Sequence, residues 1–372
     1  MRELWQRLVS LPHRGTGSGS EREAAEMLAG YLRWSGLEPE MQAFAAPASW
    51  GPEVLFISLL LGLGALFGLW WLAFLGSLAF WAYFSGWPRP WEKLFARACS
   101  QNVLASAGAG ERTLVLMAHY DSAKTHFVYD PRRVRGFRAN FLLNTALALL
   151  APLAALWGGW AGWLLGAYFL VQAALLAWRE LTAPYVSGAN DNASGVAVAV
   201  QLFLDLAAKP PPGWRLQLAL TGAEETGANG AAALLRSGRL PADAIVLNLD
   251  NVGKGELFYA VGEGMLGFTR YHGPLLEAAA KLEGARPLVY RLAYFDTWPL
   301  ARRGLAVLTL ITLENGLPAN WHWPSDVATN VDWEAVEETR AWAGRLLETL
   351  FDGDNSVYSN NIKNLRAGSG EY

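Results

Sequence analysis

Two long runs without a charged side chain constrain this chain more than any other feature. Residues 54–88 and 139–178 contain no Asp, Glu, Lys or Arg. A membrane-spanning helix needs about 20 apolar residues, and uncharged runs of this length are rare in water-soluble folds. The 18 tryptophans agree with this, because tryptophan collects at membrane interfaces. The sequence therefore predicts an integral membrane protein, with the lipid bilayer as a partner.

The two runs differ in how clearly they divide into helices. The second is about twice the length of one crossing, and Gly158, Gly159 and Gly162 indicate a turn near its middle. We interpret 139–178 as a transmembrane helical hairpin. The first run fits one long tilted helix or two short helices that turn near Trp70 and Trp71.

The rest of the chain alternates between two patterns. Short apolar segments, typical of strands buried on both faces, occupy 113–118, 215–220, 244–249 and 305–311. Helical patterns occupy 194–208, 228–236, 273–283 and 333–351, and Ser20 with Glu23 predicts a capping box for a helix that ends near Trp34. This alternation predicts an α/β fold with a mixed, mostly parallel central sheet flanked by helices.

Acidic and histidine side chains follow three of the predicted strands. Open α/β sheets bind ligands at the carboxyl ends of their strands. Two further candidates come from GANDNASG, before a predicted helix, and from a proline-containing loop near the C-terminus. The set is His119 and Asp121, Glu224 and Glu225, Asp250, Asp191 and His322. Histidine nitrogen and carboxylate oxygen suit two divalent metals that share one bridging carboxylate, for which Asp191 is a candidate.

Five stretches carry a resemblance to a known family. They are AHYDS, GANDNASG, TGAEETG, LNLDNVG and HWPSDVATNVD, and residues 11–40 add a likeness to the family's opening helix. Together they resemble the zinc exopeptidases of clan MH, which include aminopeptidase-Y-like enzymes, glutaminyl cyclases and transferrin-receptor-like peptidases. The resemblance implies the zinc-exopeptidase sandwich, two zinc ions and a peptide substrate.

The resemblance also implies a role for each motif residue. His119 and Asp250 would hold one zinc ion, Glu225 and His322 would hold the other, and Asp191 would bridge both, with a cis peptide bond after it.

Two further acids have implied roles beside the metal ligands. Glu224 would be the general base that takes a proton from the attacking water, and Asp121 would orient His119. One loop departs from the family pattern, in which Ser-Asp-His is common: Asp296 matches, but Thr297 replaces the histidine. The role of Asp296 is therefore left open.

The order of the motifs sets the number of membrane crossings. His119 precedes the second run and Asp191 follows it, so a shared site requires an even number of crossings. The same reasoning makes 54–88 a hairpin, which gives four transmembrane helices in total. The peptidase domain is then assembled from 1–53, 89–138 and 179–351. The polar segment 352–372 is predicted to be disordered or an appended tail.

Charge and composition indicate the side of the membrane on which the domain lies and the kinds of partner that the protein has. Arginines flank the second run on both sides, which predicts a catalytic domain on the cytoplasmic face; they are Arg132, Arg133, Arg135, Arg138 and Arg179. The formal net charge of −3 does not indicate a nucleic-acid partner. The sequence permits an oligomer but defines none.

The predicted function is a membrane-bound, zinc-dependent aminopeptidase. A glutaminyl-cyclase-like aminoacyltransferase that uses one zinc ion is the alternative enzyme, and retention of His119 beside Asp250 argues against it. An inactive receptor or scaffold with the same fold is the non-enzyme alternative, and the intact ligands and Glu224 argue against that. A transporter is disfavoured because neither apolar run contains an ionisable residue of the kind that marks a pathway.

Overall fold

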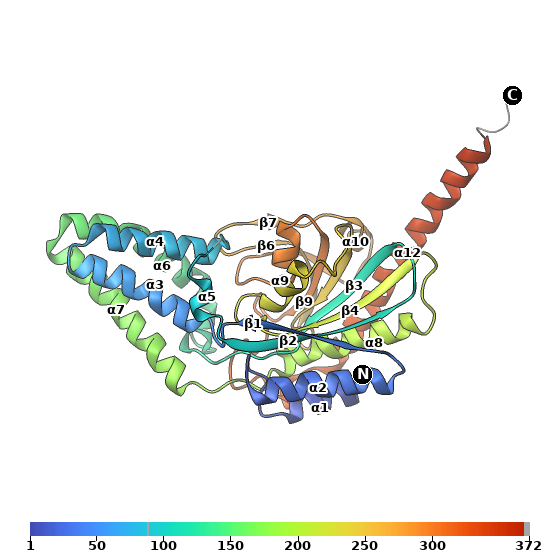
Figure 1. Cartoon of the computed structure of the whole chain (residues 1–372), viewed down its shortest axis with the longest axis horizontal. Helices are drawn as coiled ribbons and strands as arrows, with labels where there is room; N and C mark the ends of the chain where they lie inside the picture. Colours follow the sequence, from blue (N-terminus) through green and yellow to red (C-terminus); the bar gives the residue numbers. More distant parts are fainter. Residues whose placement is uncertain (88, 368–372) are drawn as a thin grey trace.

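The computed structural model describes residues 1–87 and 89–367, and its centre is one mixed sheet (Figure 1). Within the described residues the sheet has nine strands, of which eight follow a single path and one lies beside it. In spatial order the path is β1 (Glu40–Ala46), β2 (Ala98–Ala107), β4 (Trp214–Thr221), β3 (Arg112–His119), β5 (Ile245–Leu249), β9 (Ala306–Leu313), β6 (Glu256–Glu263) and β7 (Thr269–Arg270), and β8 (Arg286–Tyr290) pairs with β6.

The middle of the sheet is parallel and its flanks are mostly antiparallel. The neighbours β4, β3, β5 and β9 all run the same way, whereas β1, β2, β6 and β7 pair in antiparallel fashion. The four central strands are the four that the sequence predicts. The flanking strands were missed because they are partly exposed and lack a continuous apolar run; β1, for example, is buried only at its end.

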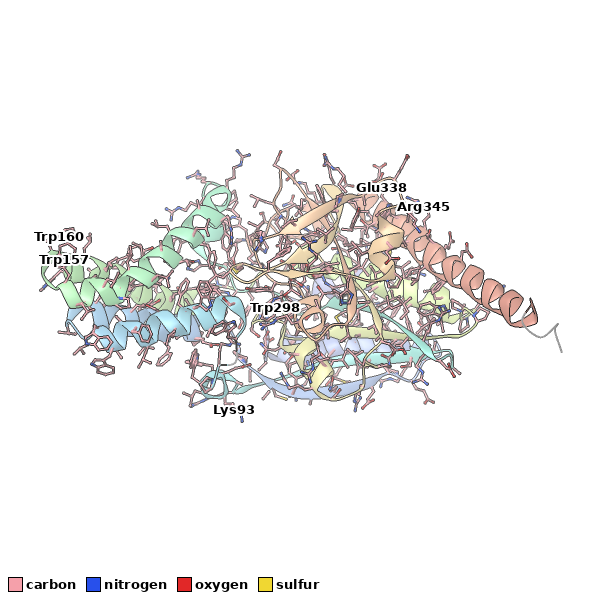
Figure 2. All side chains as sticks on the ribbon, turned by 90° about the horizontal axis from the view of Figure 1, so that it is seen from above. Lys93, Trp157, Trp160, Trp298, Glu338 and Arg345 are labelled. Atoms are coloured by element: carbon pink, nitrogen blue, oxygen red, sulfur yellow. The ribbon has the colours of Figure 1, made fainter. Side chains whose placement is uncertain are left out.

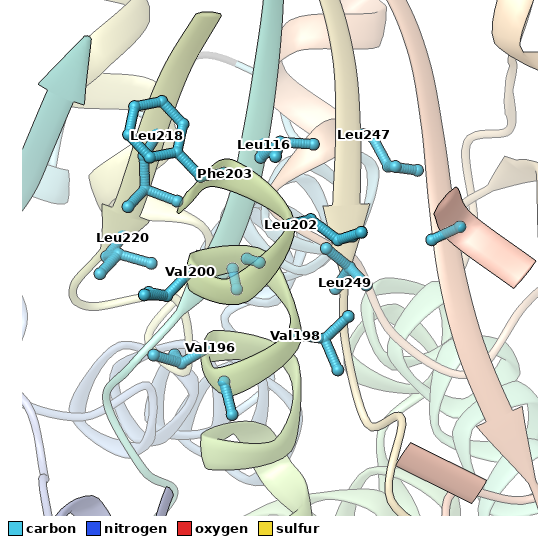
Figure 3. Close-up of a cluster of buried hydrophobic side chains, with 14 of the residues drawn as sticks. Leu116, Val196, Val198, Val200, Leu202, Phe203, Leu218, Leu220, Leu247 and Leu249 are labelled. Carbon is cyan, nitrogen blue, oxygen red and sulfur yellow. The ribbon is translucent and has the colours of Figure 1, made fainter. Parts of the chain in front are cut away.

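Helices cover both faces of the sheet. One face carries α1 (Arg2–Ser10), α2 (Gly19–Trp34), α8 (Gly195–Ala207), α10 (Pro274–Ala279) and α12 (Trp333–Ala367), and the other carries α9 (Asn229–Arg236) and α11 (Thr297–Arg302). Figure 3 shows α8 with Val196, Val200 and Phe203 against leucines of the central strands. Burial of each such side chain stabilises the fold by about 1.5–3 kcal/mol, so α8 is firmly held.

The two uncharged runs form a helical bundle that projects from one end of the sheet (Figures 1 and 2). The bundle consists of α3 (Gly51–Leu66), α4 (Trp70–Ser85), α6 (Phe137–Trp157) and α7 (Gly159–Thr182), and the short α5 (Glu92–Phe95) follows α4. The second run turns at Gly158, whose φ is +71°, near the predicted position. The first run is two short helices, which resolves the alternative that the sequence left open.

Only part of the bundle meets a length criterion for membrane crossing. Among the described residues, Val134–Trp157 and Gly159–Thr182 are the two helices long and apolar enough to cross a membrane, judged by length and composition. The helices α3 and α4 have 16 residues each, about 24 Å at 1.5 Å per residue, and fall short of a core of about 30 Å.

The predicted capping box lies two residues earlier than expected. The hydroxyl of Ser18 accepts the backbone N–H of Glu21 at 3.1 Å, and Glu21 Oε2 accepts the N–H of Gly17 at 2.6 Å. Glu21 is also buried and accepts the hydroxyl of Ser100, whereas Glu23 is exposed. Tertiary contact therefore decides between two similar local patterns.

The C-terminal segment also differs from expectation. The helix α12 continues to Ala367, through most of the segment predicted to be disordered. Residues 352–367 contain no proline and one glycine, Gly353, so a helix that already packs on the sheet can propagate through them. The remaining part of the predicted tail, 368–372, lies outside the described residues.

Candidate active site

Three neighbouring parallel strands deliver the predicted site residues to one edge of the sheet. The strand β3 ends at His119, β4 ends three residues before Glu224, and β5 ends directly before Asp250. Asp191 lies in an irregular turn, Ala189–Ser194, that leads into α8. His322 comes from the loop between β9 and α12. Elements far apart in the sequence thus meet where an α/β sheet binds ligands.

Asp191 lies at the centre of this cluster. Its Oδ1 is 3.3 Å from His119 Nε2, and its Oδ2 is 3.2 Å from His322 Nε2. On the first side, Asp250 Oδ1 lies 3.7 Å from His119 Nε2, and on the second side Glu225 Oε2 lies 2.9 Å from His322 Nε2. The arrangement is two histidine–carboxylate pairs joined by the two oxygens of one carboxylate. The peptide bond after Asp191 is cis, as the resemblance implied.

The donor set fits divalent metal ions. His119, Asp191 and Glu225 each offer a ligand atom within 4.8 Å of the others, which is compatible with a common ion. Glu225 Oε1 is buried and has no hydrogen-bond partner among the described residues. Imidazole nitrogen and carboxylate oxygen are the ligands that zinc prefers.

The pKa shifts of the site residues also favour bound cations. Burial raises the pKa of Glu225 to about 7, although His322 opposes the shift. Burial also raises the pKa of Glu224 well above its usual range, against the effect of His119. Burial alone would lower the pKa of both histidines, but the nearby carboxylates raise it well above the usual value. The site holds more buried negative charge than its own side chains neutralise, and bound cations would relieve this.

Asp121 does more than the sequence suggested. Its Oδ1 is 3.4 Å from His119 Nδ1, in place to orient the ring. The same carboxylate accepts the backbone N–H of Glu224 at 3.0 Å and of Glu225 at 3.1 Å, and the hydroxyl of Thr16 at 3.1 Å. One buried acid therefore positions a histidine and the turn that carries both glutamates.

Two residues at the site were missed by sequence reasoning. Asp326 accepts the backbone N–H of Asn190 at 2.7 Å and of Asp191 at 3.1 Å, which fixes the turn below the central carboxylate. Arg14 is fully buried and donates to the carbonyl oxygens of Tyr120, Ser187 and Gly188. Asp326 lies within the motif HWPSDVATNVD, so its place in that motif was the available signal. Arg14 had no such signal, because the groups to which it donates are backbone carbonyl oxygens, which every residue has.

Asp296 and Thr297, where the sequence departs from the family pattern, both form buried hydrogen bonds. Asp296 is buried, and its carboxylate accepts the hydroxyl of Thr221 at the end of β4. Thr297, which stands where the family often has histidine, bonds instead to Glu263 and Thr309. This side of the site is a network of buried hydroxyls and carboxyls.

A cavity of about 1000 Å³ opens over the cluster. Its floor includes all five candidate ligands and Glu224. Its walls include aromatic side chains of the sheet domain, such as Tyr290, Phe295 and Trp321, and it continues along side chains of the helical bundle. The candidate site residues are thus reached through a large, mostly apolar space.

Comparison with known proteins agrees with this fold. The model of peptidase family M28 matches residues 102–346, more than half of the chain, and the chain belongs to that family. No curated protein matches the chain by sequence.

Several solved structures share the fold. A Zn-dependent exopeptidase from Parabacteroides distasonis has a TM-score of 0.56 at 13% identity, over 94% of this chain and 96% of that one. A zinc aminopeptidase from Bacillus subtilis has a TM-score of 0.55 at 13% identity, over 93% and 94%. The glutaminyl cyclase of Porphyromonas gingivalis has a TM-score of 0.57 at 15% identity, over 93% and 96%. These similarities establish the zinc-exopeptidase fold and leave the reaction to be argued from the site.

Proposed function

We propose that this protein is a membrane-bound aminopeptidase that uses two zinc ions to remove N-terminal residues from peptides. The observation that carries the proposal is the pair of histidine–carboxylate sets on opposite oxygens of Asp191. His119 and Asp250 would hold one ion, and His322 and Glu225 the other. When bound, zinc supplies a polarised scissile carbonyl and a water of lowered pKa.

Glu224 fits the role of general base. It lines the cavity, and its Oε2 lies 3.9 Å from His119 Nε2, outside the shorter contacts that join the five ligands. As general base it would accept a proton from the attacking water and return it to the leaving amine. Because Asp121 holds the backbone of Glu224 and Glu225, one carboxylate can face the substrate while its neighbour faces a metal.

The test compares wild type with Glu224→Gln on short peptides, with and without a chelator. We expect chelator-sensitive release of the N-terminal residue, lost in Glu224→Gln although zinc stays bound. Peptides that begin with glutamine separate the two enzyme classes, because a glutaminyl cyclase would close the glutamine into a ring without hydrolysis. Wild type that binds zinc but releases no amino acid from any peptide would contradict the proposal.

The membrane part of the proposal rests on the surface of the bundle. Large apolar side chains are exposed along all four helices; examples are Phe74, Leu153 and Leu181, which is 84% exposed. An exposed apolar surface of this extent marks a membrane or partner interface. Glycines allow α3 and α7 to approach closely: a Cβ on Gly166 would lie 2.8 Å from Leu66 N. Small residues at such contacts are typical of helices packed in lipid.

Tryptophans border the bundle at both ends. Trp157 and Trp160, more than three quarters exposed, lie at the far tip, with Trp163 near them in the chain (Figure 2). Trp87 and Trp178 are exposed at the ends of α4 and α7 nearest the domain. Two aromatic belts of this kind are expected at two membrane interfaces.

The proposed topology has both helix pairs crossing the bilayer and the catalytic domain on the cytoplasmic face. Because α3 and α4 have only 16 residues each, their crossing requires the bilayer to thin locally around them. The exposed arginines 132, 133 and 135, directly before α6, support that side. Alkaline extraction of membranes and protease protection in vesicles test it. Release of the protein by alkaline carbonate, or protection of the segment 120–130 on the side opposite to 184–190, would overturn this topology.

A further inference from the structure

The cavity above the candidate ligands has a second part inside the helical bundle. We call this part the bundle arm. It is lined by side chains of α4, α6 and α7, among them Phe80, Phe141, Asn144, Tyr168 and Gln172. Trp298, which lines the same cavity, lies where the bundle meets the domain (Figure 2). The arm and the catalytic floor are therefore one continuous space.

This space is larger than one amino-acid side chain requires, and its lining is mostly apolar. Pockets for drug-sized molecules occupy about 300–1000 Å³, and this cavity lies at the upper end of that range. Most of the arm is aromatic or aliphatic, so an occupant that leaves water for it gains about 25 cal/mol for each Å² of apolar surface buried. The arm thus fits an apolar occupant longer than a single residue.

The arm is open at the side of the bundle. Leu164, Val171 and Leu175 of α7 line the cavity and are also 64%, 58% and 45% exposed. Asn140 of α6 lines the cavity and is exposed as well. The cavity therefore reaches the outer surface between α6 and α7. A chain bound in the arm can continue outward through this gap, which in the proposed topology faces lipid.

Polar groups within the arm favour a peptide over an acyl chain. Tyr168 donates its hydroxyl to Asn144 Oδ1 at 3.0 Å, beside the cavity. Gln172 Oε1 is buried and has no hydrogen-bond partner within the described part of the chain. A buried acceptor of this kind costs about 1–3 kcal/mol until it is satisfied. A peptide N–H would satisfy it, whereas an acyl chain offers no donor.

Charge sets the direction of the peptide. The catalytic floor is rich in buried carboxyl groups, including Asp191, Glu224 and Asp250. An N-terminal ammonium is attracted to this end, and a phosphate headgroup is repelled from it. The described residues of α4, α6 and α7 that line the bundle arm carry no charge, so uncharged side chains suit it; Arg89 and Arg133 line the cavity outside these helices.

We infer that the bundle arm binds the residues after the scissile bond of apolar peptides, which enter from the bilayer between α6 and α7. The inference rests on the proposed aminopeptidase activity and adds its substrate class: peptides with an apolar N-terminal segment, such as fragments of membrane-spanning helices. Selectivity then lies in the residues that remain on the peptide, since these occupy the arm.

The first test uses peptides that share one N-terminal residue, in protein reconstituted into lipid nanodiscs. A dipeptide, an apolar hexapeptide and a polar hexapeptide are compared. We expect kcat/KM for the apolar hexapeptide to exceed that for the polar one by at least about tenfold. Ala167→Trp places a bulky side chain in the arm. We expect this substitution to lower the ratio of kcat/KM for the apolar hexapeptide to kcat/KM for the dipeptide by a similar factor. Leu153→Trp is the matched control, because Leu153 is exposed on α6 and does not line the cavity.

A second measurement does not depend on turnover. Binding of a fluorescent apolar hexapeptide to Glu224→Gln in nanodiscs is expected to weaken when Gln172→Leu is added, and to weaken further with Ala167→Trp. Equal cleavage of apolar and polar hexapeptides, or binding unchanged by both substitutions, would overturn the inference. Binding of a lysophospholipid by a protein that binds no peptide would also overturn the inference, in favour of a lipid site. If none of the peptides is cleaved but the binding pattern holds, the aminopeptidase proposal fails and the arm assignment stands.

Discussion

The position of Asp191 depends on Asp326, and this dependence can be measured. Asp326 is buried and accepts two backbone N–H groups from the turn that carries Asp191. Asp326→Ala leaves both donors without a partner in a place that water does not reach. Each buried unsatisfied donor costs about 1–3 kcal/mol, so the unfolding free energy should fall by about 2–6 kcal/mol. Asp326→Asn keeps one acceptor oxygen and should lose about half as much.

The same substitution should weaken metal binding without touching a metal ligand. Loss of a residue that positions a ligand typically costs about 10–100-fold in metal affinity or activity. Zinc affinity would be titrated against a competing chelator, and thermal unfolding followed by tryptophan fluorescence. Asp332→Asn is the control: Asp332 is an exposed acid that accepts the N–H of Glu334 at the start of α12. Because asparagine caps a helix about as well as aspartate, this control should change stability little and leave zinc affinity unchanged. An Asp326→Asn protein with wild-type zinc affinity and melting temperature would refute the reasoning.

Three further expectations follow from single residues. Asp121→Asn, which loses a charged acceptor for two backbone groups, should lower kcat/KM about 10–100-fold, and a smaller effect than in a Thr16→Val control would count against its role. Burial raises the pKa of Glu263 to about 8, so the folded state holds a proton that the unfolded state releases. Its contribution to stability is present at low pH and is lost between about pH 4.5 and 8; unfolding titrations of Glu263→Gln should show a flatter decline over that window. Gly166→Ala should lower the melting temperature, because its Cβ meets the backbone of Leu66, whereas Gly30→Ala, with open space around it, should not.

The sequence predicted those parts of the fold whose signal is local. Buried parallel strands have continuous apolar runs, so β3, β4, β5 and β9 were found. The acids that follow them were found because strand ends converge at one edge. The strands β1 and β2 were missed because they are partly exposed and pair through backbone groups of any sequence.

The rest of the site could not be predicted because it depends on contacts between distant segments. Arg14 bonds to carbonyl oxygens 173 and 174 positions away in the chain, and carbonyl oxygens are the same for every residue type. The bundle arm was not predicted for a related reason. Leu175 lines the cavity and Leu181 does not, yet both are exposed leucines of α7. Only the packing of the helices distinguishes them.

The order of the segments along the chain has a consequence for biosynthesis. All four helices of the bundle leave the ribosome before Asp191, and His322 follows the end of α7 by about 140 residues, or about 7–28 s at ~5–20 residues per second. The candidate active site is therefore completed late, and in the proposed topology the four helices would by then have had time to insert into the membrane. A nascent chain that lacks His322 has no complete site, so, if the proposed function holds, peptidase activity would appear only after the helices of the bundle have been made.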